Sequence, residues 1–134
     1  MARKKQRAAA MRSADLPADD FKNYALAVGA VQRALAEAIS MLKTKADRAI
    51  DLDEGNRLAE AAGDLQEKLQ EINRELTVFL AGTGQVVPPS DADVKQLQKI
   101  ADDLDGMIAT QQAAQAIIKA ATNVVDIWKG TRPK

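Results

Sequence analysis

Three groups of carboxylates are the residues whose types and spacing could do chemistry in this sequence. The first group, Asp51, Asp53 and Glu54, could bind calcium. A twelve-residue calcium loop needs ligands at alternate positions, glycine at the sixth position and a bidentate acid at the twelfth. Asn56 and Ala62 occupy those two positions. The sequence therefore predicts that these acids cap a helix and do not hold an ion.

The second group is an acidic row at helical spacing, made of Glu60, Asp64, Glu67, Glu71 and Glu75. Two-metal sites in helical bundles need inward-facing glutamates together with Glu-x-x-His segments on partner helices, and this chain contains no histidine and no cysteine. The third group, Asp102, Asp103 and Asp105, has the pattern of a solvated helix face. We therefore predict no metal, no cofactor and no enzymatic activity.

The acidic row belongs to a stretch whose opposite face is apolar, from Leu58 to Leu80. Its apolar residues recur at alternating spacings of four and three: Leu58, Ala62, Leu65, Leu69, Ile72, Leu76 and Phe79. Residues three and four apart lie on one face of an α-helix, so this stretch predicts an amphipathic helix that needs partner helices. We expect the chain to be organised around it, with its segment from Leu65 to Leu76 most buried.

The breaks between helices are marked by capping and turn residues. Asp51 and Glu54 have the spacing of a capping box, and Gly55 follows them. This favours a tight reversal at 51–56, although one continuous rod through this segment is the alternative. The segment from Gly82 to Pro89 cannot be helical throughout. Ser90 and Asp93 repeat the capping spacing, so the predicted helices cover about 17–50, 53–81 and 91–129.

Three long helices with short connections predict an all-α fold, an antiparallel up-down-up three-helix bundle. A chain of 134 residues is the size of one domain, which we expect to cover residues 15–134. At about 1.5 Å per residue the third helix would exceed the second by roughly two turns. Its end should therefore project past the bundle near the 51–56 turn.

Charge is concentrated at the two ends of the chain. The first twelve residues carry +5, the last six carry +3, and residues 13–128 carry −8. We expect residues 1–14 to form a disordered basic arm, because they carry like charges and have little to bury. An organellar transit peptide is the alternative. We expect no transmembrane segment and a cytoplasmic location, since we find neither an apolar run of roughly 20 residues nor the apolar core of a signal peptide.

By elimination, the first functional hypothesis is a non-enzymatic interaction or structural module. The C-terminal part of the last predicted helix is apolar on all sides, and if it overhangs its partners it exposes Ile117, Val124, Ile127 and Trp128. We expect these residues to bind a second copy or another protein, with Trp128 as anchor. The alternative is that the first two helices reach far enough to cover them.

Two further hypotheses belong to other classes. A polyanion binder would use the arm residues Arg3, Lys4, Lys5, Arg7 and Arg12 on nucleic acid or another anionic surface. A membrane-active protein would use the segment from Gly106 to Ile118, which has no charged residue. Alanine and glutamine dominate that segment, so close helix packing explains it better than contact with lipid.

The polyanion hypothesis makes a direct prediction. Binding to nucleic acid should be weak and indifferent to base sequence, and removal of residues 1–12 or moderate salt should abolish it, because every contact would be a phosphate contact. A gel-shift titration with full-length and truncated protein checks this. Sequence-selective binding that persists in the truncated protein would contradict the hypothesis.

Overall fold

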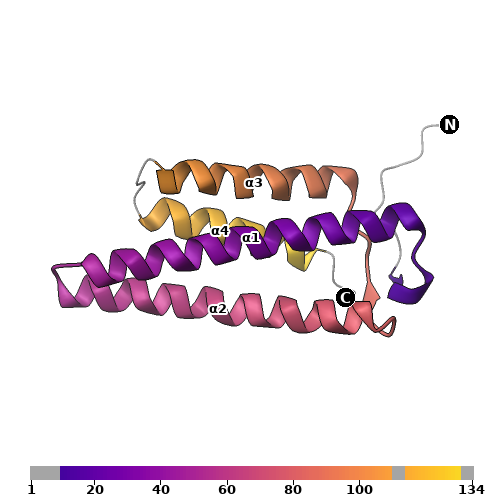
Figure 1. The fold of residues 1–134 in the computed structure, drawn as a ribbon, viewed down its shortest axis with the longest axis horizontal. Coiled ribbons are helices and arrows are strands. Elements are labelled where there is room, and N and C mark those ends of the chain that lie inside the picture. The colour runs from indigo at the N-terminus through magenta and orange to yellow at the C-terminus, as the bar shows by residue number, and fades with distance from the viewer. Residues whose placement is uncertain (1–9, 110–113, 131–134) are drawn as a thin grey trace.

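The computed structural model describes residues 10–109 and 114–130, which form an all-α fold. Their elements are β1 (Met11–Arg12), a 3-10 turn (Ser13–Asp15), α1 (Ala18–Arg48), α2 (Leu52–Leu80), β2 (Gln85–Val86), α3 (Asp91–Ala109) and α4 (Ala114–Lys129). Successive helices run in opposite directions, and α1 lies between α2 and α3 (Figure 1). The prediction of an all-α fold is confirmed.

Two of the predicted helix boundaries are set by side-chain caps. The Asp51 carboxylate accepts a hydrogen bond of 3.0 Å from the backbone N–H of Asp53, and α2 begins there as a separate helix. The continuous-rod alternative is therefore wrong. At the start of α3, the backbone N–H of Ser90 donates to the Asp93 carboxylate at 3.2 Å, and the N–H of Asp93 donates to the Ser90 hydroxyl at 3.1 Å. This pair is a reciprocal capping box.

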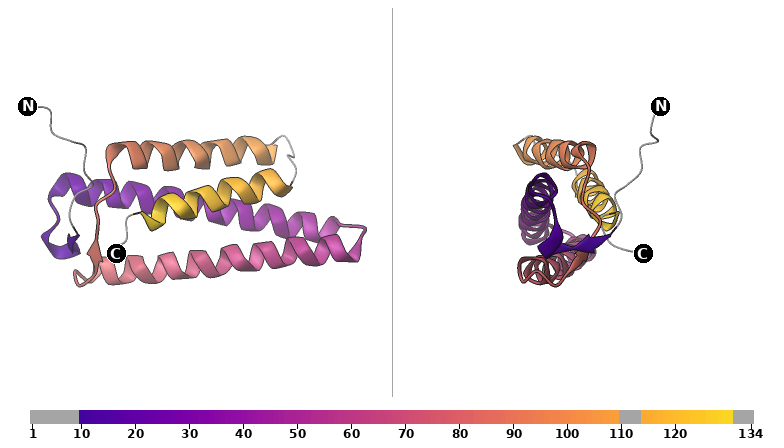
Figure 2. Two further views of the ribbon diagram at one scale, coloured as in Figure 1. Left: turned by 180° about the vertical axis from the view of Figure 1, so that it is seen from behind. Right: turned by 90° about the vertical axis from the view of Figure 1, so that its right-hand side faces the viewer.

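The single third helix predicted over 91–129 is wrong, because the described residues form two helices there. α3 ends at Ala109, and α4 begins at Ala114 and runs back in the opposite direction (Figure 2). The described part of the chain therefore forms four antiparallel helices, where the sequence predicted three. The return of α4 brings Trp128 to the end of the molecule where α2 finishes, opposite to the expected end at 51–56.

The helix at the centre of the packing is α1, and the prediction that Leu58–Leu80 holds this place is wrong. α1 packs against α2, α3 and α4, whereas Leu69 and Leu76 of α2 are only partly buried. The reason is the width of the apolar face on α1, where small side chains let neighbouring helix axes approach on several sides. Its buried residues are Tyr24, Ala27, Val28, Ala30, Val31, Ala34, Leu35, Ala38, Ile39 and Leu42.

The chain before α1 is ordered from residue 10 onward, which corrects part of the predicted disorder of residues 1–14. Met11 pairs with Val86 in an antiparallel two-stranded sheet, and the backbone N–H of Ser13 donates to the carbonyl of Gly84 at 2.8 Å. Gly82, at φ 80°, ends α2 in the left-handed conformation that favours glycine and starts the loop that reaches β2. Residues 1–9 lie outside the described part of the chain.

The four helices differ in length, and this leaves one end of the bundle uncovered. α1 and α2 have 31 and 29 residues, whereas α3 and α4 have 19 and 16. All four approach the end that carries β1 and β2, so the α1–α2 hairpin projects past α3 and α4 at the other end (Figure 1). The sequence predicted that the end of the third helix would project from the bundle. The element that projects is instead the α1–α2 hairpin.

Among the described helices, α1 is long and apolar enough to cross a membrane, judged by length and composition alone. Half of its most apolar segment is buried in the bundle, which is also typical of the core helix of a folded domain. The expectation of no transmembrane segment stays a prediction.

The central place of α1 predicts the effect of truncating its core leucine. Leu35→Ala should lower the free energy of unfolding by about 2–5 kcal/mol, the usual range for a fully buried leucine. Leu69→Ala in α2 should cost less, because that side chain keeps contact with solvent. Urea denaturation of the two variants measures the difference, and a larger loss for Leu69→Ala would contradict this account of the core.

Candidate functional site

The four residues predicted to form an exposed interaction surface lie in or against the core. Ile117, Val124 and Trp128 are 0, 0 and 1% exposed, and Ile127 is partly buried. The predicted exposure is wrong because α4 folds back along α1 and packs against α1, α2 and α3. The apolar character of this segment is explained by burial between neighbouring helices.

Trp128 belongs to a cluster that contains all four aromatic residues of the chain. Tyr24 stacks on Phe79 with ring centroids 3.7 Å apart, and the Phe21 and Trp128 rings lie 5.3 Å from Phe79 and Tyr24, respectively. These side chains come from α1, α2 and α4, next to the β1–β2 pair. The cluster therefore joins three helices at one end of the bundle.

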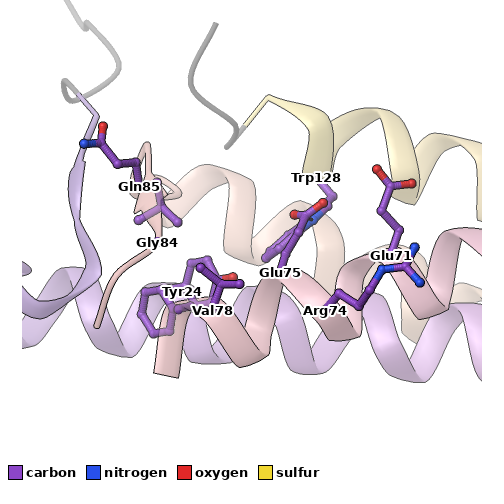
Figure 3. Close-up of a pocket in the computed structure, with 10 residues that line it drawn as sticks. Tyr24, Glu71, Arg74, Glu75, Val78, Gly84, Gln85 and Trp128 are labelled. Atoms are coloured by element: carbon purple, nitrogen blue, oxygen red, sulfur yellow. Dashed lines mark hydrogen bonds between the residues drawn. The ribbon is translucent and has the colours of Figure 1, made fainter. Parts of the chain in front are cut away.

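A partly buried hydrogen bond orients the tryptophan. The Trp128 indole Nε1–H donates to the Glu75 carboxylate at 3.1 Å, and Figure 3 shows this carboxylate beside the indole ring. The same carboxylate acts on Tyr24, whose hydroxyl has its pKa raised by burial and, to a lesser extent, by the charge of Glu75. Tyr24 thus keeps its proton at neutral pH and is unsuited to act as a base.

These residues line a cleft of about 390 Å³ at the β1–β2 end. Its apolar wall includes Val78 and Val86, and its polar side chains come from Tyr24, Glu71, Arg74, Glu75 and Gln85 (Figure 3). Within this lining we find no serine, threonine or cysteine nucleophile beside a base. The arrangement packs and orients an aromatic cluster, and its geometry does not assemble a catalytic pair.

A second charged cluster lies where α1 faces α3. Arg33 forms ion pairs with Asp102, with Asp105 at 3.8 Å and with Glu37 at 3.8 Å. One Glu37 carboxylate oxygen is buried and has no hydrogen-bond partner among the described residues. The pKa of Glu37 is raised to about 7, chiefly because burial desolvates its carboxyl group. The nearby Asp105 adds to the rise, and the positive charge of Arg33 opposes it.

The end of the α1–α2 hairpin carries the most exposed large apolar side chains of the described residues. We call Ile50, Asp51 and Leu52 the α1–α2 tip. Ile50 is 104% exposed and Leu52 is 76% exposed. Beside the tip lies a hollow of about 740 Å³, the tip hollow, lined by Met41, Thr44, Lys45, Arg48, Ala49, Ile50, Asp51, Glu54, Leu58 and Ala114. Val78, which is 47% exposed, lines the smaller cleft beside Trp128, whereas the tip places the two most exposed aliphatic side chains beside the larger hollow.

The basic arm can be placed only in part. Arg12 lies in β1 and pairs with Asp15 at 3.5 Å. Arg3, Lys4, Lys5 and Arg7 lie outside the described residues, so the polyanion hypothesis stays a prediction. Within residues 10–109 and 114–130, no group of three or more acidic, histidine or cysteine side chains is placed to hold a metal ion.

Comparison of the chain with protein-family models, with curated proteins and with solved structures gives no match. The functional argument therefore depends on the residues and their geometry. The sequence signals that could have located the tip were Ile50 and Leu52 themselves, two large aliphatic residues beside the capping Asp51 in a predicted turn.

The raised pKa of Glu37 predicts how stability depends on pH. The native state holds this proton more tightly than the unfolded chain, whose glutamate has the ordinary pKa of 4.5. Its contribution to stability is thus complete below about pH 4.5 and is lost as pH rises through about 7. Glu37→Gln should remove this dependence, because glutamine does not titrate. At pH 8 it should raise the free energy of unfolding by about 1 kcal/mol relative to wild type, because it removes a partly desolvated charge. The gain stays this small because the side chain is partly solvated.

Urea denaturation at pH 5 and pH 8 measures this effect. Glu67→Gln is the matched control, because Glu67 is an exposed glutamate of α2, and it should change stability by less than about 0.5 kcal/mol at either pH. An equal effect of Glu37→Gln at both pH values would show that Glu37 does not titrate in this range.

Proposed function

We propose that this protein is a non-enzymatic helical-bundle module that binds protein through the α1–α2 tip and the tip hollow. This replaces the surface expected at the end of the last helix, because Ile117, Val124 and Trp128 are used in the core. The proposal keeps the class of function that the amphipathic sequence favoured and moves its site from the last helix to the turn between α1 and α2.

One observation carries the proposal: Ile50 and Leu52 are held in solvent at the end of a hairpin that α3 and α4 do not cover. Burial of one large aliphatic side chain is worth roughly 1.5–3 kcal/mol. Two such side chains beside a concavity are a ready source of binding energy, whereas isolated exposed apolar residues are common on any surface. Asp51 caps the start of α2, and local order of this kind lowers the entropy cost of binding.

The rest of the described surface supports a binding role better than a catalytic one. The cleft beside Trp128 is lined by side chains that already contact one another, and Tyr24 within it keeps its proton. The Arg33 cluster is a set of ion pairs between α1 and α3. Both features lie between helices of the bundle, and neither brings a nucleophile and a base together.

Site-specific photo-crosslinking in the native host tests the proposal. A photo-reactive amino acid at position 52 should give covalent protein adducts, because this side chain would lie in the interface. The adducts should disappear when Ile50→Asp is introduced into the same chain, since a charge at the tip opposes apolar contact.

The matched control places the same photo-reactive residue at position 80. Leu80 is 66% exposed and lies at the opposite end of α2, outside the tip. Equal adducts at positions 52 and 80, or adducts at 52 that survive Ile50→Asp, would show that the tip is not a binding surface.

A further inference from the structure

The α1–α2 tip carries a protruding part and a receiving part within one surface. Leu52, which is 76% exposed, is the protruding part. The tip hollow next to it has an apolar wall to which Met41, Ala49 and Leu58 contribute. A leucine side chain from a partner is small enough for a hollow of about 740 Å³.

The charged residues that line the tip hollow are divided between the two helices. Lys45 and Arg48 lie in the last turn of α1, and Asp51 and Glu54 lie at the start of α2. A partner with a strong charge of one sign would be attracted by one helix end and repelled by the other. A partner with the same divided pattern, turned to face this one, can pair both halves.

We propose that the partner of the tip is a second copy of this chain, bound across a two-fold axis. This inference rests on the proposed binding function of the tip. A two-fold interface requires that one surface patch be complementary to itself, and the tip offers an exposed leucine, a hollow and charges of both signs. Leu52 of each copy enters the tip hollow of the other, and Arg48 of each copy faces the acidic start of α2 in its partner.

The dimer should be reversible. Stable protein interfaces bury a total of about 1,200–2,000 Å², and the tip offers only the end of one hairpin. We therefore expect association in the micromolar range or weaker, and a monomer–dimer equilibrium that depends on protein concentration.

Sedimentation velocity of the purified full-length chain over about 5–500 µM tests this inference, since weak dimers form in that range. Leu52→Gln should weaken dimerisation at least about tenfold, because it removes the inserted apolar side chain. Leu80→Gln, which changes an exposed leucine at the other end of α2, should leave the dimer unchanged. Both positions are solvent-exposed, so thermal melts should show both variants folded.

Charge exchange between the two helix ends provides a second, independent test. Arg48→Glu and Glu54→Arg should each weaken self-association about tenfold, because each places like charges opposite one another twice in the dimer. An equimolar mixture of the two variants should restore association, because each mixed dimer again pairs opposite charges. A merely structural effect of either substitution would not be rescued by mixing.

The outcomes separate this inference from the proposed function. Dimerisation that Leu52→Gln weakens, Leu80→Gln spares and the charge-exchanged mixture restores supports the two-fold dimer. A monomer at every concentration, or a dimer indifferent to Leu52→Gln, overturns it. If the purified chain is monomeric while position 52 still gives tip-dependent adducts to another protein in the host, the inference fails and the proposed function stands.

Discussion

The packing of α1 against three other helices is the constraint on which the rest of the structure depends. Its buried residues include Ala27, Ala30, Ala34 and Ala38, whose small side chains allow close approach on more than one side. Valine, leucine and isoleucine at intervening positions then fill the space toward α2, α3 and α4. Since α3 and α4 are much shorter than α1, they cover only part of its length, and the hairpin end of α1 and α2 is left uncovered.

The two ends of the bundle are built from different kinds of residue. At one end the four aromatic side chains, the Glu75–Trp128 hydrogen bond and the β1–β2 pair close the structure. At the other end Ile50 and Leu52 lie in solvent beside the tip hollow. The aromatic end also exposes Phe21, Val78 and Leu80, at 45, 47 and 66%, whereas the tip carries the two most exposed large aliphatic side chains of the described residues. This asymmetry is why we assign binding to the tip.

The parts of the fold that depend on local chemistry could be predicted from the sequence. Asp51 caps α2, and Ser90 with Asp93 caps α3, because capping needs only a side-chain oxygen and a nearby backbone N–H. Gly82, Pro88 and Pro89 likewise excluded a helix between α2 and α3. These signals located the end of α1, both ends of α2 and the start of α3 to within two or three residues.

The parts that depend on packing between distant segments could not be predicted in this way. The apolar spacing from Val94 to Trp128 fits one helix, with Gln111 as a polar residue at an apolar position. Periodicity alone does not distinguish a straight helix from two antiparallel helices with the same buried faces. The error determined the candidate site: a straight helix exposes Trp128, whereas a folded-back helix buries it. The periodicity of Leu58–Leu80 was also clear, yet the wider alanine-rich face of α1 became the centre.

The central claim is that α1 forms the core and that the α1–α2 tip is the uncovered surface. Hydrogen exchange measured at two protein concentrations tests it. The slowest amides should lie in α1 between Ala27 and Leu42, because their exchange requires global unfolding. Amides of residues 48–54 should exchange quickly in dilute protein and more slowly at high concentration, when the tip is occupied. If the slowest amides lie in α2, and exchange at 48–54 is the same at both concentrations, the claim is wrong.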